Sequence, residues 1–270
     1  MQFADVELAH RLEFAEAYAN RKSVEARATM SPNLGATWAQ FGAAYAMFDG
    51  VGSPLTQTFG LGLGVAVDAS TLDQLEQFFF SRGSDVFQEV CPLAGVEVQA
   101  LLASRGYAPI ELTSVMFRPL TGDGGLGVEL NPRLRVRETT PADTDVFVET
   151  TVAGWSEYKE VAGMIGGLAR MMVSRADVPA FIAELDGRAI ATGAMWTAGT
   201  VALMAGASTV PEARKQGAQR ALVDARLRAA KKKGCDLAMM CAAPGSSSQR
   251  NAERNGFRIA YTRTKWQRRR

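Results

Sequence analysis

The residues best suited to chemistry lie in the stretch PEARKQGAQRAL, where a strand gives way to a helix. A glycine at the start of a helix lets an anion approach the backbone, and the first N–H groups of the helix have no intrahelical partner. Basic side chains around such a turn add favourable charge, so the stretch predicts a phosphate cradle. A glycine after basic residues also opens helices that bind nothing. The predicted cradle consists of Arg214, Lys215, Gln216, Gly217, Ala218, Gln219 and Arg220.

Other common catalytic groups are scarce. His10 is the only histidine, and a triad or Cys–His mechanism would have to rely on this one residue within a helical pattern. The three cysteines, Cys91, Cys235 and Cys241, are odd in number and form no CxxC pair. We therefore predict neither a disulfide framework nor a metal site.

Length, composition and charge suggest two domains and an anionic ligand. A chain of 270 residues can bury two cores, and 47% hydrophobic with 21% charged residues is typical of soluble proteins. No apolar run reaches the roughly 20 residues of a membrane helix, and the start is acidic rather than signal-like, so we expect a cytoplasmic protein without membrane contact. Residues 131–270 carry 23 basic against 13 acidic side chains, which places an anionic ligand there. Alternatively, the basic second half could dock against the acidic first half.

Breakers divide the chain, and the second part has a clear element order. Five glycines and prolines within 121–134 indicate a linker, which gives domains at 1–125 and 133–270 joined by 126–132. Periodicity after the linker predicts the order βααβββαβαβ, with a tight hairpin at Asp186-Gly187. The stretches 83–107 and 234–257 share glycines at matching positions, which favours an internal duplication.

This order, together with the turn, resembles the GNAT superfamily of acyl-CoA-dependent N-acetyltransferases. Its pattern (Arg/Gln)-x-x-Gly-x-(Gly/Ala) is matched by Arg214 and Gly217 after Pro211, whereas Gln219 departs from it. The resemblance covers about 133–266, and mainly 70–118 in the first half. It implies an α/β (α+β) fold of two GNAT-like domains, each a mixed, mostly antiparallel sheet flanked by helices. The first domain is expected to be degenerate, because its glycine-rich turn has no basic residue.

The resemblance implies acetyl-CoA as cofactor. It would lie where the strand VALMAGAS splays from DLAMMCA, with a backbone N–H near Ala207 stabilising the oxyanion. Asn251 is expected to touch the cofactor or to belong to a solvated helix face. The pantetheine arm would pair with the backbone of Gly206, Ser208 and Thr209.

A protonated amine must lose a proton before it attacks, so a carboxylate base is expected. Glu157 is the favoured candidate because its loop lines the acceptor site in this superfamily, and Glu160 and Glu184 are alternatives. Trp155 and Tyr158 in the same loop would either shape the acceptor pocket or fasten the loop to the core.

The leaving thiolate is usually protonated by a tyrosine, but that position is Ala252 here. Ser248, one turn earlier on the same helix face, could donate instead or could cap the helix. Tyr261 and Tyr158 remain further possibilities for the proton donor.

Three functions remain open. The first is acetyl transfer from acetyl-CoA to the primary amine of a small molecule or peptide, by direct attack on the thioester in the second domain. The second is a non-catalytic acyl-CoA-binding or sensing protein, and the third is an interaction module without cofactor. The basic end KWQRRR lacks a stacking platform and is expected to be a solvated tail rather than a nucleic-acid site. The sequence does not predict an oligomeric state.

Overall fold

A computed structural model describes residues 4–127 and 129–270, and Val128 of the predicted linker lies outside them. The chain divides into two compact units. Unit 1 comprises the described residues up to Met116, together with Cys241–Arg250 and Arg258–Arg270; unit 2 comprises Phe117–Met240 and Asn251–Phe257. This division differs from the sequence-based boundaries of 1–125, 126–132 and 133–270, because the last strand belongs to unit 1.

Unit 1 is a mixed sheet flanked by helices, with strand order β1-β2-β3-β4-β11-β5. The pairs β1–β2, β2–β3 and β4–β11 are antiparallel and β3–β4 is parallel. Its helices are α1 (Val6–Met30), α2 (Ala69–Phe80) and α3 (Val96–Ser104). Its strands are β1 (Thr37–Phe41), β2 (Ala44–Phe48), β3 (Gln57–Phe59), β4 (Val86–Val90), most of β5 (Ala108–Pro119), and β11 (Arg258–Arg268).

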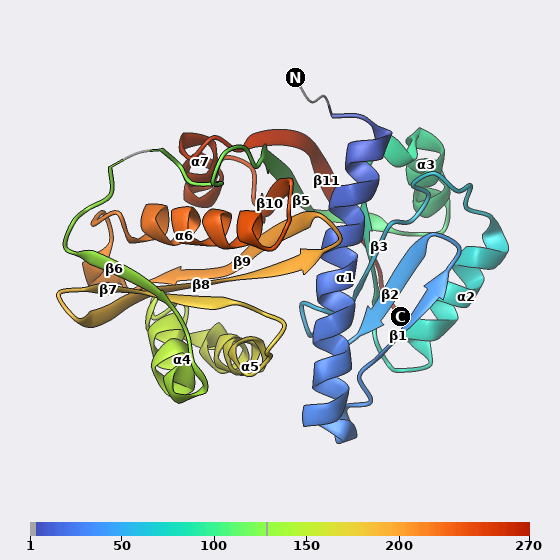
Figure 1. Cartoon of the computed structure of the whole chain (residues 1–270). Coiled ribbons are helices and arrows are strands. Elements are labelled where there is room, and N and C mark those ends of the chain that lie inside the picture. The colour runs from blue at the N-terminus through green and yellow to red at the C-terminus, as the bar shows by residue number, and fades with distance from the viewer. Residues whose placement is uncertain (1–3, 128) are drawn as a thin grey trace. The chain divides into compact units, whose positions relative to one another are not determined.

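The two faces of this sheet bury different cores. Met47 and Phe59 pack with residues of α1, whereas Ala46 and Phe48 on the other face pack with α2 and α3. This alternation follows from the two-residue period of a strand. Unit 1 is therefore a three-layer structure, with α1 on one face and α2 and α3 on the other (Figure 1).

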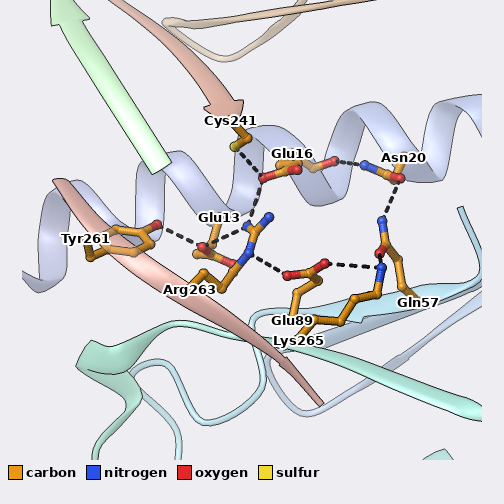
Figure 2. Close-up of polar contacts among 9 residues, drawn as sticks. All are labelled: Glu13, Glu16, Asn20, Gln57, Glu89, Cys241, Tyr261, Arg263 and Lys265. Atoms are coloured by element: carbon orange, nitrogen blue, oxygen red, sulfur yellow. Dashed lines mark hydrogen bonds and ion pairs between the residues drawn. The ribbon is translucent and has the colours of Figure 1, made fainter. Parts of the chain in front are cut away.

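An ion-pair cluster fixes α1 to β11 inside unit 1 (Figure 2). Arg263, 2% exposed, binds Glu13 at 3.1 Å, Glu16 at 2.8 Å and Glu89 at 2.8 Å. Tyr261 donates its hydroxyl to Glu13 at 2.8 Å. Burial raises the pKa of Glu13, although Arg263 opposes the shift.

Residues 134–268 follow the predicted element order, and the strands of unit 2 are arranged β10-β9-β8-β7-β6. Adjacent strands are antiparallel except for the parallel pair β9–β10. The strands are β6 (Leu134–Glu138), β7 (Ala180–Leu185), β8 (Arg188–Ala198), β9 (Val201–Thr209) and β10 (Leu237–Ala242), whose last two residues group with unit 1. The helices are α4 (Thr144–Ala153), α5 (Ala162–Val173), α6 (Ala218–Lys232) and α7 (Ser247–Arg254), of which α7 straddles the division.

Local sequence explains these elements. Thr140 and Asp143 form a capping box ahead of α4, and Pro141 is the first residue of the short 3-10 turn that leads into that helix. The hairpin between β7 and β8 turns at Asp186 and Gly187, both with positive φ, as predicted. α6 packs on β7, β8 and β9 from one face, and α4 packs on β8 and β9 from the other (Figure 1).

The matched glycines of the internal duplication all have positive φ, which residues with a Cβ rarely adopt. The pairs are Gly83 with Gly234, Gly95 with Gly245 and Gly106 with Gly256. Both copies fold as strand, helix and strand. No helix in the described part of the chain is long and apolar enough to span a membrane.

Candidate functional site

The predicted cradle is a helix N-terminus without a side-chain cap. Lys215 and Gly217 have positive φ values of 66° and 89°, and α6 begins directly after them. Gly217 is the N-cap residue and provides no side chain to bind the first N–H groups of the helix. The Asn131 side chain donates to the carbonyl oxygen of Gln216 at 3.0 Å and so stabilises the turn. The geometry leaves backbone donors and the positive helix end available to an anion.

The basic side chains of the cradle are exposed, as are Gln216 and Gly217, whereas Ala218 is buried. Lys215 and Arg220 are solvent-accessible, and Arg214 lies 2.7 Å from the carboxylate of Glu157. Arg214 also donates to the carbonyl oxygen of Gly154 at 3.4 Å. The predicted base and one predicted phosphate ligand therefore pair with each other in this structure.

Gln219 uses its side chain to hold the end of β9. Its amide nitrogen donates to the Ser208 carbonyl oxygen at 2.9 Å and to the Thr209 hydroxyl at 2.8 Å. The sequence singled out Gln219 as a departure from the family pattern. The structure shows that this side chain occupies a backbone acceptor expected to serve a cofactor.

A β-bulge interrupts β9 at the predicted oxyanion position. Thr192 and Ala194 of β8 face Ser208 and Ala205, so Gly193 alone stands opposite both Gly206 and Ala207. Gly206 has φ 62°, and a Cβ there would lie 2.7 Å from the Met172 side chain. Ala207 is exposed, which leaves its backbone accessible.

The two central strands separate beyond this pairing. The parallel register joins Val201–Leu203 of β9 to Leu237–Met239 of β10 and does not include Met204–Thr209. One edge of β9 thus lacks β10 as a partner from Met204 onward. A separation of these two strands is what the resemblance implied.

The loop after α4 carries the two predicted acceptor-site aromatics. Trp155 and Tyr158 contact each other with ring centroids 6.0 Å apart, and they are 37% and 54% exposed. Because neither ring is buried, the alternative that they fasten the loop to the core is not supported. Gly154 permits the close approach of α4 to β9, since a Cβ there would overlap the Ser208 hydroxyl.

The three candidate bases differ in their surroundings. Glu157 and Glu160 are exposed, whereas Glu184 binds Arg137 at 2.8 Å. Arg137 also binds Asp143, and this contact holds the pKa of Asp143 well below its usual range. Glu184 therefore belongs to an ion-pair network between β6 and β7, which leaves Glu157 and Glu160 as accessible carboxylates.

The candidate acids are equally distinct. Ala252 is fully buried and offers no proton. Ser246, not Ser248, caps α7 by accepting the Gln249 N–H at 3.1 Å, so the predicted alternative role of Ser248 as the cap is wrong. Tyr261 donates to Glu13 within unit 1, where burial raises its pKa well above the ordinary value.

Asn251 is partly engaged within α7. The Asn255 side chain donates to its carbonyl oxygen at 2.8 Å and to its Oδ1 at 3.3 Å. Its side-chain amide nitrogen remains the group that could meet a ligand.

In unit 1 the corresponding turn ends in an aspartate, Asp68, which caps the following helix. Helix α2 also follows a glycine-rich turn, but Asp68 accepts the Thr71 N–H at 2.7 Å. This hydrogen bond lowers the pKa of Asp68. A carboxylate thus occupies the helix end that a phosphate would need.

One buried residue was missed by the sequence reasoning. Arg226 of α6 is fully buried and donates to the carbonyl oxygens of Ala194 and Ala205, beside the bulge. The available signal was its position four residues after Leu222, on the apolar face of the helix.

Comparison with known proteins finds a family match within the second half of the chain. Residues 144–257 match the Acetyltransferase (GNAT) family. No curated protein matches the sequence significantly.

Solved structures resemble most of the chain in fold. A GCN5-related N-acetyltransferase from Kribbella flavida aligns with TM-score 0.66 and 18% identity over 91% of this chain and 95% of that one. Another from Sphaerobacter thermophilus gives TM-score 0.58 and 15% identity over 84% and 76%. A tandem GNAT protein from the clavulanic acid biosynthesis pathway gives TM-score 0.58 and 15% identity over 83% and 78%. The predicted fold class is confirmed.

Proposed function

We propose that this chain transfers the acetyl group of acetyl-CoA to a primary amine, with unit 2 carrying the cofactor site, because residues 144–257 match the GNAT acetyltransferase family. The observation that carries this proposal is the uncapped N-terminus of α6 behind left-handed Gly217, next to a β9 strand that diverges from β10.

Acetyl-CoA supplies an activated thioester, and the chain supplies the groups that orient it. The N–H groups at the start of α6, with Arg214, Lys215 and Arg220 around them, bind the diphosphate. The backbone of Gly206, Ser208 and Thr209 and the side chain of Asn251 contact the pantetheine arm. The N–H of Ala207 at the bulge binds the oxyanion. Holding both reactants in register supplies much of the rate.

Glu157 removes the proton of the amine, directly or through water. Glu157 forms an ion pair with Arg214 in this structure. When the Arg214 guanidinium binds the diphosphate instead, this ion pair breaks and the Glu157 carboxylate becomes available to the acceptor amine. Trp155 and Tyr158 form the acceptor side of the site. Ser248 donates a proton to the thiolate. Alternatively the sulfur leaves as the thiolate itself, because the pKa of its conjugate thiol is near 8.5.

Unit 1 acts as a degenerate GNAT-like domain without a cofactor. The support is Asp68, whose carboxylate at the start of α2 would repel a phosphate and already accepts the Thr71 N–H.

A non-catalytic acyl-CoA-binding protein is the second candidate. Two observations favour it: buried Ala252 stands where a proton donor is expected, and Gln219 occupies the Ser208 carbonyl oxygen. The two candidates differ in turnover and agree in cofactor binding.

The test is calorimetric titration of acetyl-CoA into the protein and into Gly217→Glu, followed by an amine screen. The variant places bulk and negative charge in the cradle and should abolish one-site micromolar binding. Gly187→Glu is the matched control, because Gly187 also has positive φ with open space around a Cβ. Equal binding by all three proteins would place the site elsewhere. Absence of binding to the parent would refute both candidates, and binding without turnover of any amine would favour the second.

A further inference from the structure

Arg226 is a buried cation of unit 2 in an unusual setting. Its Nε donates to the Leu222 carbonyl oxygen at 3.0 Å, and Nη1 donates to Ala194 at 3.1 Å and Ala205 at 3.4 Å. Nη2 is buried without a hydrogen-bond partner among the described residues. A Cβ at Gly193 would lie 3.0 Å from the guanidinium carbon, so this glycine makes room for the charge.

No carboxylate compensates this charge. Within the described chain no ion pair involves Arg226, in contrast to Arg263 in unit 1 with its three carboxylates. Burial alone lowers the pKa of Arg226 to about 10. An unpaired buried ion destabilises the fold, and a hydrophobic side chain of similar volume would avoid that cost. Fold stability therefore does not explain the arginine, and a buried group kept at such expense is a functional candidate.

The guanidinium lies directly beside the bulge. Ala205 precedes Gly206, and its carbonyl belongs to the peptide group that provides the Gly206 N–H. A charged donor on that carbonyl polarises the peptide and strengthens its N–H as a donor, because hydrogen bonds in series reinforce each other. The same contacts to Ala194 and Ala205 hold the last regular pair before the two strands lose register.

We propose that Arg226 is a positioning residue for acetyl transfer: through the carbonyl oxygens of Ala194 and Ala205 it fixes the β9 bulge and polarises the peptide that ends in the Gly206 N–H, so that this N–H and the neighbouring Ala207 N–H bind the negative charge that develops on the thioester oxygen. This inference rests on the proposed function. It assigns part of the electrostatic stabilisation of the oxyanion to a buried side chain of α6.

The test compares two ligands that differ in charge at the reacting atoms. Acetyl-CoA has a neutral carbonyl there, and S-carboxymethyl-CoA has a carboxylate. The parent protein should bind the carboxymethyl compound about tenfold more tightly, since a unit charge several ångströms away at intermediate dielectric is worth at least that factor. Arg226→Met should reduce the preference to about one, and Arg226→Lys should retain part of it.

Two control variants separate this local effect from general charge. Lys232→Met removes an exposed cation from the same helix and should leave the preference unchanged. Arg220→Met alters the cradle and should weaken both ligands by the same factor. With an amine identified, Arg226→Met should lower kcat at least tenfold with little change in the KM for acetyl-CoA, as expected for a group that acts in the transition state.

Three results would overturn the proposal. The first is a parent protein that binds both compounds equally, which needs no variant and so does not depend on whether a variant folds. The second is an Arg226→Met protein that is folded and retains the preference. The third is a parent that binds neither compound, which refutes the proposed function and this inference with it.

Discussion

At the scale of residues, the contact between Arg214 and Glu157 joins the proposed phosphate cradle to the proposed base. Both side chains are about half exposed, so the pair contributes at most about 1 kcal/mol. Binding of a diphosphate can therefore displace the carboxylate at small cost. A sequence could suggest each residue separately, but not their pairing, because it depends on how the loop after α4 meets the turn before α6.

Glu157→Gln should consequently change affinity and turnover in opposite directions. Loss of the ion pair frees Arg214, so acetyl-CoA should bind up to about threefold more tightly. Loss of the base should lower kcat about 10²-fold. Calorimetry measures the first effect and steady-state kinetics with an active amine the second. Glu160→Gln serves as control, and weaker cofactor binding by Glu157→Gln would contradict this account.

At the scale of elements, the order of unit 2 could be predicted because its signals are local. Thr140 with Pro141 begins a helix, Asp186-Gly187 turns a hairpin, and Gly217 opens α6, each within a few residues. Features that depend on distant segments could not be predicted. Glu184 pairs with Arg137 over 47 positions, and Arg226 is buried although arginine usually marks an exposed helix face.

The contact of α4 with β9, two segments far apart in the sequence, depends on Gly154. A Cβ at Gly154 would overlap the Ser208 hydroxyl and lie 2.9 Å from the Thr209 backbone nitrogen. Gly154→Ala should therefore lower the free energy of unfolding by about 1–3 kcal/mol. Gly163→Ala is the control, because a Cβ there meets nothing within 4 Å and alanine favours a helix. Urea unfolding of both variants tests the contrast, and equal stability would contradict it.

At the scale of the molecule, unit 1 is assembled from both ends of the sequence. Arg263 of β11 binds Glu13 of α1 across 250 positions, and β11 lies between β4 and β5 in the sheet. The sequence predicted a strand there but assigned it to the second domain, because strand composition does not specify a partner. The polar interior of unit 1 was also not predicted.

The buried Glu13 makes stability depend on pH in a defined direction. Because its folded pKa is raised above the ordinary 4.5, its contribution is present below that value and is lost as pH rises through the folded pKa. As pH rises above about 4.5, the parent should lose stability relative to Glu13→Gln, which carries no titratable group at that position. Urea unfolding across this range measures the difference. Glu7→Gln, at an exposed site on α1, should show no such trend.

The position of β11 at the end of the chain also delays completion of the unit 1 sheet during translation. Glu89 on β4 meets Arg263 only 174 residues later, a delay of roughly 10 to 35 s at ordinary rates of translation. During that interval the nascent chain has β4 without its neighbour, and an unpaired strand edge invites association with other chains. Ribosome-associated chaperones would therefore have their main client in the first third of this protein, even though it is the first part to leave the exit tunnel.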